Sequence, residues 1–297
     1  MTSEARDIRT LVAEELSQPV DARVRDVAAA IAAKHGDASR AVLFYGSCLR
    51  EQRLEGLMLD FYLIVSEYRS AYATRWLAAA NRLIPPNVFY FEHGGLVAKY
   101  AVLSEADFAH ECSPEAWTVS TATRFAQPSR LVWSADRVAA ERMVDIVSMA
   151  APTLLGWTLP LVDRRDVPAV WKRAFRQTFA AELRAERLDR SAAIVDADLE
   201  RYERFGQAIL DSLPAAAAGG RRRALRWWKR KQRRGKRYSV LRLAKASLTF
   251  AGGADYIAWK INRHSAAGIE LKPWQRRHPL LAGLSLLPRL LRTGAVR

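Results

Sequence analysis

The sequence predicts an α/β (α+β) fold, in which a mixed sheet flanked by helices is followed by a second helical domain and a basic amphipathic C-terminal tail. Three observations predict it. Short apolar runs are interspersed with helical periodicity in the first third of the chain, helical signals follow up to residue 213, and the charge changes sharply near residue 216. The predicted domains are therefore residues 1–135, 136–215 and 216–297.

The first domain is expected to contain a helical segment at residues 3–34, where apolar positions recur at helical spacing. The strand candidates are short apolar runs bounded by turn or helix-breaking residues. Gly46-Ser47 closes the first of these runs, Pro85-Pro86 ends the helix before the third, and Gly94-Gly95 is the expected hairpin turn between the last two. The candidates are residues 41–45, 58–65, 88–91 and 97–103.

The second domain and the tail differ in charge. Helical periodicity continues from residue 135 to 213, and Pro152, Pro160 and Pro168 are expected to break it into shorter helices. The alanine-rich run 215–220, which ends in two glycines, is interpreted as a linker. Residues 216–297 hold 21 Lys and Arg against 2 acidic residues, a net charge of +19, so residues 1–215 carry −3 of the chain's +16. This excess indicates an anionic partner for the tail.

Composition excludes several classes of protein. A hydrophobic content of 50% excludes disorder of the whole chain, and two cysteines allow at most one disulfide. No leader is recognised at the N-terminus, so a reducing, cytoplasmic compartment is expected. The apolar stretch 280–291 contains Pro288 and Arg289 and is shorter than a membrane span, so no membrane-spanning helix is expected. No zinc spacing or serine-nucleophile triad is found.

Asp60 is the first candidate functional residue, because an acid inside an apolar strand carries a desolvation cost. Upstream, the turn at Gly46-Ser47 offers a close backbone approach and a hydroxyl at the start of an expected short helix. A strand, this turn, a helix and a strand with an inward carboxylate are suited to holding a nucleoside triphosphate and its metal, the pattern of nucleotidyltransferases. The alternative is a strand-end carboxylate that reaches solvent or a backbone amide. No counter-ion is expected beside Asp60 in the free protein.

The expected metal is Mg²⁺, with Asp60 as its ligand. Nucleotidyltransferases usually carry a second acid two residues later, where this chain has Tyr62. A lone carboxylate binds Mg²⁺ weakly and leaves most of its coordination shell to substrate phosphates and water. Glu92, at the end of the next strand candidate, is a further possible ligand, although a solvated acid is its ordinary role.

Several short motifs in one order resemble the translocator-assembly-and-maintenance family, the peripheral phosphatidate cytidylyltransferases. They extend from residue 41 to 263, and each of them is short and inexact. The motifs are Tyr45-Gly46-Ser47, Leu59-Asp60-Phe61, the run 98–104 with Lys99, Trp117, Arg124 to Pro128, Phe179 to Arg184, and Lys245 to Lys260. In that family a single acid occupies the position of Asp60, so Tyr62 is consistent with it.

The resemblance implies roles for individual residues. Asp60 and Lys99 would be catalytic, and Tyr45, Gly46, Ser47 and Arg124 would bind the phosphates of CTP. Glu182, Arg184 and Lys245 would contact the substrate or the membrane. The departures are Cys48 for a glycine, Gln127 for a lysine, whose lost anion contact Arg130 is expected to replace, and Glu182 for an aspartate. These departures concern substrate detail rather than the class of reaction.

Each of these residues also has an ordinary structural role to weigh against the functional one. Lys99 is otherwise a surface lysine, Arg124 a helix-surface charge, and Trp117 and Tyr100 core residues. Glu182 and Arg184 are otherwise part of a solvated helix face.

The tail is interpreted as a membrane-binding segment. Between Arg221 and Arg237, 11 of 17 residues are basic and none is acidic. Trp227 and Trp228 lie within this run and are expected to anchor at the headgroup boundary, and residues 240–250 and 280–291 to form interfacial amphipathic helices. The expected partners are CTP, phosphatidate and an anionic membrane surface rather than nucleic acid.

The predicted function is therefore Mg²⁺-dependent phosphatidate cytidylyltransfer, CTP plus phosphatidate giving CDP-diacylglycerol and pyrophosphate, in phospholipid (cardiolipin or phosphatidylglycerol) synthesis. The expected location is peripheral, on the inner face of the cell membrane or the matrix face of a mitochondrial inner membrane. Two alternatives remain open. One is nucleotidyl transfer to a soluble acceptor such as a sugar or an antibiotic, and the other is a non-catalytic membrane or nucleic-acid adaptor with a decayed transferase fold.

Overall fold

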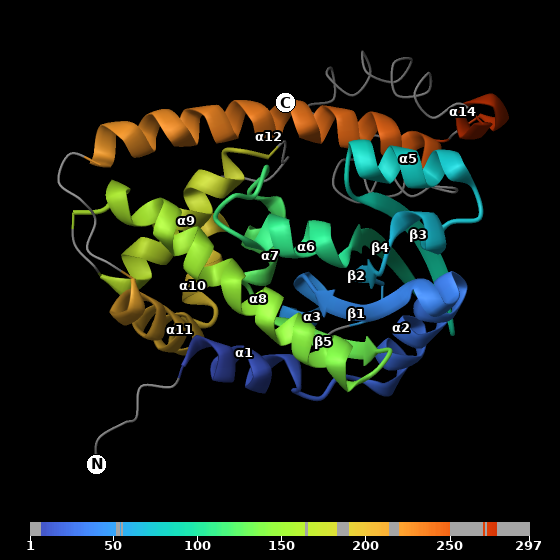
Figure 1. The fold of residues 1–297 in the computed structure, drawn as a ribbon, viewed down its shortest axis with the longest axis horizontal. Coiled ribbons are helices and arrows are strands. Elements are labelled where there is room, and N and C mark those ends of the chain that lie inside the picture. The colour runs from blue at the N-terminus through green and yellow to red at the C-terminus, as the bar shows by residue number, and fades with distance from the viewer. Residues whose placement is uncertain are drawn as a thin grey trace.

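The computed structural model describes residues 7–51, 54, 56–163, 166–182, 190–213, 220–249, 270 and 272–277. Strands and helices are interspersed up to β5, and the described elements after β5 are helical (Figure 1). In chain order the elements are α1 Ile8–Leu16, α2 Ala22–His35, η1 Gly36–Ala38, β1 Ser39–Tyr45, α3 Ser47–Glu51, β2 Met58–Val65, α4 Tyr68–Ala71, α5 Arg75–Leu83, β3 Asn87–His93, β4 Leu96–Ser104, α6 Glu105–Cys112, α7 Ser120–Phe125, β5 Ser129–Ser134, α8 Arg137–Thr158, η2 Leu159–Leu161, α9 Val167–Phe179, α10 Arg190–Asp196, α11 Leu199–Ser212, α12 Gly220–Thr249 and α14 Pro273–Arg277.

The described strands form one five-stranded sheet in the order β3-β4-β2-β1-β5. β2 and β4 run parallel, whereas β1 pairs antiparallel with β2 and β5, and β3 pairs antiparallel with β4. The predicted mixed sheet flanked by helices is confirmed, and so are the four strand candidates. The fifth strand, β5, was not expected from the sequence.

Alternate residues of a strand point to opposite faces of the sheet. Apolar side chains therefore project from both faces, and helices cover each of them. On β2, Leu59, Phe61 and Leu63 belong to a buried cluster with α2 and the α4–α5 region. Tyr62 and Ile64 belong to the other cluster, which includes residues of α1, α6, α7, α8, α9 and α11. Asp60 lies between Leu59 and Phe61 on β2, so its side chain projects from the opposite face, the face of Tyr62. It therefore faces the helices of the second cluster.

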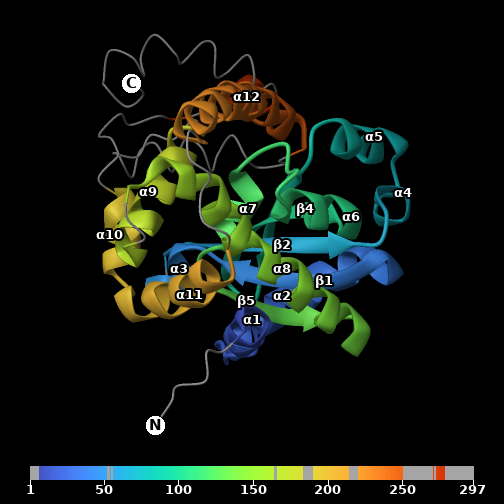
Figure 2. The same cartoon turned by 60° about the vertical axis from the view of Figure 1, so that its left-hand side comes forward.

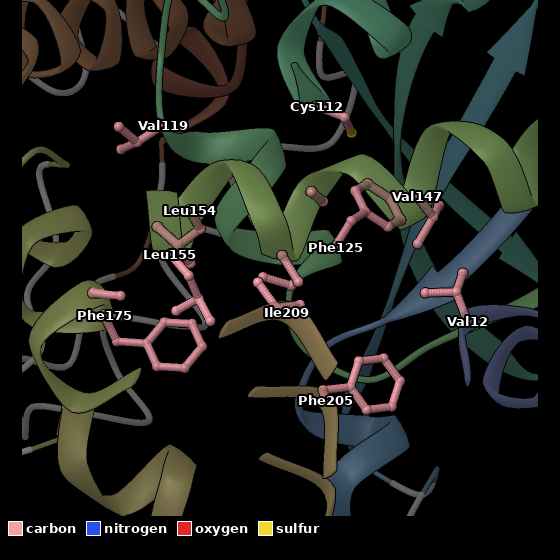
Figure 3. Packing of buried hydrophobic residues seen from close by; sticks show 14 of the residues in the cluster. Val12, Cys112, Val119, Phe125, Val147, Leu154, Leu155, Phe175, Phe205 and Ile209 are labelled. Atoms are coloured by element: carbon pink, nitrogen blue, oxygen red, sulfur yellow. The ribbon is translucent and has the colours of Figure 1, made fainter. Parts of the chain in front are cut away.

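The helices after β5 complete the same core (Figure 3). Trp171 of α9 is 0% exposed and its indole Nε1 donates to the carbonyl oxygen of Tyr202 on α11 at 2.8 Å. Gly206 lies at this crossing, where a side chain would collide with Val167 and Trp171. The buried cluster therefore extends across residue 135, and the division into a first and a second domain stays a prediction.

Pro152 does not break its helix, in contrast to the expectation. α8 continues through it, and Ala151, Leu154 and Leu155 beside it are at most 3% exposed. A proline inside a helix costs about 3 kcal/mol, and burial of this apolar face offsets that cost. Pro160 and Pro168 instead lie in the first turn of η2 and α9. By length and composition α8 with η2 is apolar enough to cross a membrane, but a buried core helix passes the same test.

α12 lies along the body of the molecule, across α9 and α7 towards α5 (Figures 1 and 2). Trp228 belongs to the main buried cluster, and Gly235 faces the carbonyl oxygen of Ala181 so closely that a side chain there would collide with it. The described part of the tail is thus packed on the body rather than separated from it. Residues 215–219 of the predicted linker and the stretch 280–291 lie outside the described residues.

Candidate active site

Asp60 and Lys99 form an ion pair on the sheet. They are register partners on the parallel strands β2 and β4, so both side chains project from the same face. The Lys99 Nζ lies 2.9 Å from the Asp60 Oδ1, and the side chains of Lys99 and Asp60 are 33% and 16% exposed. The expectation that Asp60 has no counter-ion is therefore wrong: pairing of distant strands supplies one. The catalytic roles that the resemblance implies for the two residues stay predictions.

Gly46 lies directly against the carboxylate of Asp60. Tyr45, the last residue of β1, is the register partner of Asp60, and Gly46 then turns the chain with a φ of 95°. A Cβ at this position would lie 2.7 Å from the Asp60 Oδ2. Both the positive φ and the close approach require glycine. The predicted placement of the Gly46-Ser47 turn beside Asp60 is confirmed, and its role in binding phosphate stays a prediction.

Gly46→Ala is expected to remove most of any activity that depends on Asp60. The methyl group displaces the carboxylate, and the positive φ adds about 1–3 kcal/mol of backbone strain. The measurement pairs a nucleotidyl-transfer assay with thermal unfolding. Gly36→Ala is the matched control, because its φ is also positive, at 55°, but nothing lies within 4 Å of a Cβ there. Equal activity loss in both variants would contradict a special role for Gly46.

Tyr45 and Tyr62 line the face beside the ion pair. Their ring centroids lie 5.4 Å apart, and both rings contact Phe125 of α7. Burial, followed by the negative charge of Asp60, raises the pKa of Tyr45 well above its usual value, so the phenol is neutral at physiological pH. Tyr62, at the position of the usual second acid, is 3% exposed and is a core residue.

Arg124 of α7 connects this face with Glu182. Its Nη1 donates to the backbone oxygen of Ser120 at 2.9 Å and lies 3.3 Å from the Glu182 Oε1. The Ser120 hydroxyl also donates to that oxygen, at 2.6 Å. Burial opposes the charge of Arg124, but Glu182, the two tyrosines and Asp60 together raise its pKa. The structure thus brings Glu182 and Arg124 together, whereas Arg184 lies outside the described residues.

Lys245 joins α12 to the loop between α5 and β3. It is 8% exposed, and its Nζ donates to the backbone oxygens of Ile84 and, at 2.8 Å, Pro86. Burial, followed by repulsion from Arg242, lowers the pKa of Lys245 to about 7. This contact fastens α12 to the loop, and a role of Lys245 in binding substrate or membrane stays a prediction.

The two tryptophans of α12 face the protein. Trp228 is 1% exposed and its Nε1 donates to the backbone oxygen of Trp157 at 3.0 Å, so its expected role as a membrane anchor is wrong. Trp227 is half-buried, with its ring centroid 5.1 Å from that of Trp157. The Lys231 ammonium lies 5.1 Å and 4.9 Å from the Trp157 and Trp227 centroids. The basic segment is thus a helix whose aromatic side packs inward.

The opposite side of α12 carries exposed basic side chains. We name it the outer basic face, and α12 contains no acidic residue to balance it. Its members are Arg222, Arg223, Arg226, Lys229, Arg230, Arg233, Lys236 and Arg237.

Two arginines near the site were not expected from the sequence. Arg50 of α3 donates from Nη1 to the Gln127 Oε1 at 3.1 Å. Gln127 occupies the position at which the family that the motifs resemble commonly has lysine. Arg242 of α12 donates from Nε to the backbone oxygen of Pro85 at 2.7 Å. Its position 15 residues after Trp227 is compatible with the same side of one helix, and that periodicity is the signal that would have identified it.

The residues of this site can bind a divalent cation in one way, with a single carboxylate as the protein ligand. No group of three His, Cys, Asp or Glu side chains gathers within the described part of the chain, so that part forms no protein-only cage. Mg²⁺ is, however, commonly held by one or two carboxylates together with substrate phosphates and water. Asp60, whose Oδ2 faces the Gly46 turn, meets this requirement as a single ligand.

No protein-family model matches the chain, and no curated protein matches it significantly. Among solved structures, it is similar to a nucleotidyltransferase-like protein from Exiguobacterium sibiricum 255-15, with 10% identity and a TM-score of 0.29 over 91% of this chain and 92% of that one. A TM-score of 0.29 is too low to establish a common fold, and the fold class rests on the sheet and helices described above.

Proposed function

We propose that the protein is a nucleotidyltransferase that transfers the cytidylyl group of CTP to phosphatidate, giving CDP-diacylglycerol and pyrophosphate. The observation that carries the transferase proposal is the approach of Gly46 to the Asp60 carboxylate beside the Lys99 ammonium. The choice of CTP and phosphatidate comes from the resemblance of the sequence motifs to the peripheral phosphatidate cytidylyltransferases.

The reaction requires the protein to neutralise the charge of the two substrates and to align them. A phosphate monoester is mostly a dianion at neutral pH, because its second pKa lies near 6. Its oxygen attacks the α-phosphorus of CTP, and the bond to the β-phosphate oxygen breaks to release pyrophosphate. No general base is needed. Lys99 and Arg124 would offset the negative charge of the reacting phosphates, and the neutral Tyr45 hydroxyl would offer a hydrogen bond.

Asp60 would hold Mg²⁺ together with the phosphates of the nucleotide. When bound there, the cation would supply further neutralisation of the triphosphate charge. Because Asp60 is a single protein ligand, we propose that it binds the cation tightly only when nucleotide is present. Lys99 then has two roles, as the counter-ion of Asp60 in the free protein and as a phosphate contact in the complex.

One experiment tests the proposal directly. Purified protein is incubated with labelled CTP, Mg²⁺ and phosphatidate in mixed micelles, and the expected product is a lipid-soluble labelled nucleotide. A parallel reaction contains a soluble phosphate ester in place of the lipid. Label in a water-soluble nucleotide conjugate only in that second reaction would favour a soluble acceptor. Absence of transfer in both would favour the non-catalytic adaptor.

Lys99→Ala is expected to lower transfer more than about tenfold and to weaken CTP binding, because one charge-assisted contact is worth about 1.5–3 kcal/mol. The control is Arg82→Ala on α5, where the arginine is exposed. Initial rates and equilibrium CTP binding are the two measurements. If both variants behave alike, Lys99 is only a surface charge.

The outer basic face of α12 is proposed to bring the protein to an anionic membrane surface. Each basic residue near an anionic leaflet contributes about 1 kcal/mol. Deleting α12 would not test this cleanly, since Trp228 is part of the core. Substitution on the outer face avoids that difficulty.

Replacing Arg226, Lys229 and Arg233 together with glutamine is expected to reduce sedimentation with vesicles that contain anionic lipid about tenfold or more. Because Trp228 is buried, we expect binding of the unsubstituted protein to be released almost completely by salt, through screening. The control replaces three exposed basic residues of other helices, Arg25, Arg75 and Arg137, with glutamine. Retained vesicle binding in the α12 variant, or tighter binding to duplex DNA than to vesicles, would contradict the membrane role.

A further inference from the structure

Arg124 and Arg242 are brought to one place from elements far apart in the sequence. The Arg242 Nη1 lies 3.4 Å from the Ser120 Oγ, and the Arg124 Nη1 lies 2.9 Å from the backbone oxygen of the same serine. Both guanidinium groups therefore border Ser120. Arg124 comes from α7 and Arg242 from α12, so the docking of α12 creates the pair.

The two arginines differ in their partners. Glu182 contacts Arg124 at 3.3 Å and receives the Ser120 hydroxyl. Glu111, the other carboxylate whose charge reaches Arg242, accepts from the backbone amide and the hydroxyl of Thr118. Burial lowers the pKa of Arg242, and the charge of Arg124 opposes the nearby carboxylates by lowering it further. Within the described part of the chain, Arg124 pairs with Glu182 whereas half-buried Arg242 donates to neutral oxygens, those of Pro85 and Ser120. An anion would stabilise this arrangement.

The pair lies close to the ion pair of the sheet. Tyr45 is the register partner of Asp60, and its ring centroid lies 6.0 Å from that of Phe125, which follows Arg124 in α7. Arg242 contacts Ser120 and the backbone of Pro85 rather than the Asp60–Lys99 pair. A ligand held by the two arginines would thus lie beside the proposed nucleotide site and would depend on Arg242, which that site does not use.

We infer that Arg124 and Arg242 form, across Ser120, a second anion site that takes the phosphomonoester group of the acceptor. This inference rests on the proposed function, since it assigns the acceptor side of that reaction. Two guanidinium groups provide several donors and two positive charges, which match the oxygens and the charge of a phosphate dianion. The phosphomonoester is supplied either by a lipid headgroup or by a soluble ester.

Arg242→Gln tests the site in the full-length protein. The probes are a short-chain, water-soluble phosphatidate, glycerol 3-phosphate and CTP, each titrated calorimetrically without the other substrate. Affinity for the phosphomonoester is expected to fall about tenfold or more, the loss of one charge-assisted contact. Affinity for CTP should stay within twofold of wild type. Arg242→Lys should restore part of the loss, and Arg82→Gln on α5 is the control.

The outcomes separate this inference from the proposed function. Unchanged phosphomonoester binding in Arg242→Gln, or an equal loss of CTP affinity, would overturn the site whatever the transfer assay gives. Loss confined to the phosphomonoester would uphold the site even if no transfer is found with either acceptor, in which case the proposed function fails alone. Binding of phosphatidate but not of glycerol 3-phosphate identifies a lipid source, and equal binding of both identifies the phosphate group itself. If Arg242→Gln fails to fold, the same comparisons are made with Arg242→Lys, whose phosphomonoester affinity should then lie below that of wild type at unchanged CTP affinity.

Discussion

Asp60→Asn is expected to lower nucleotidyl transfer by about 10²–10³-fold, the range that follows loss of one electrostatic contact at a reacting centre. The amide cannot balance Lys99 and is a poor ligand for a cation shared with substrate phosphates. The change in stability should be small, because Lys99 is 33% exposed and is solvated when its partner is lost. Initial rates and thermal unfolding are measured together.

The matched control for Asp60→Asn is Asp145→Asn on α8. Asp145 accepts from the Arg9 Nε at 2.8 Å, but both side chains are about half exposed, at 46% and 51%. This control should leave the transfer rate unchanged. Transfer by Asp60→Asn within a few-fold of wild type, with the fold intact, would contradict the proposed role of the carboxylate.

Arg201→Met is expected to destabilise the protein by about 3–5 kcal/mol, the largest effect on stability that we predict. Arg201 of α11 forms a two-point ion pair with Glu15 of α1, and the side chains are 7% and 8% exposed. Its Nη1 also donates to the backbone oxygen of Ala126 at 3.2 Å. The substitution leaves the buried Glu15 carboxylate without this partner. Urea unfolding monitored by circular dichroism measures the loss.

The double variant Glu15→Leu/Arg201→Met makes the test specific to the ion pair. Removing both charges should cost less than Arg201→Met alone, because no uncompensated charge is then buried. Arg137→Met is the surface control, since the Arg137–Glu141 pair is 91% and 55% exposed and contributes little. A double variant less stable than Arg201→Met would mean that packing, rather than charge, is what Arg201 contributes.

The sequence predicted the sheet well where strands are apolar and bounded by turns. β2 begins and ends at the predicted residues, and the hairpin of β3 and β4 lies where Gly94-Gly95 indicated. β5 was missed because its apolar run, residues 131–133, is only three residues long and because the strand is mostly half-buried. The continuation of α8 through Pro152 could not be predicted either, because it depends on how much apolar surface the neighbouring helices bury.

The sequence predicted the candidate site only where its residues lie close to one another along the chain. The approach of Gly46 to Asp60 follows from a strand, a turn and the next strand, which the sequence displays in order. The pairing of Asp60 with Lys99 depends on two strands that β3 and two helices separate along the chain. In α12 the high density of Arg and Lys concealed which residues face inward, so Trp228 was assigned to a membrane and Arg242 was overlooked.

The position of α12 near the C-terminal end has a consequence for the order in which the molecule is completed during synthesis. Chains grow from the N-terminus at about 5–20 residues per second, and the earlier part can begin to fold first. The Asp60–Lys99 pair uses only residues made in the first third of the chain, whereas the Arg124–Arg242 pair requires a helix that ends at Thr249. A nascent chain therefore acquires the sheet half of the site before the α12 half. During that interval Trp157 lacks the indole of Trp228 that contacts it in the finished protein.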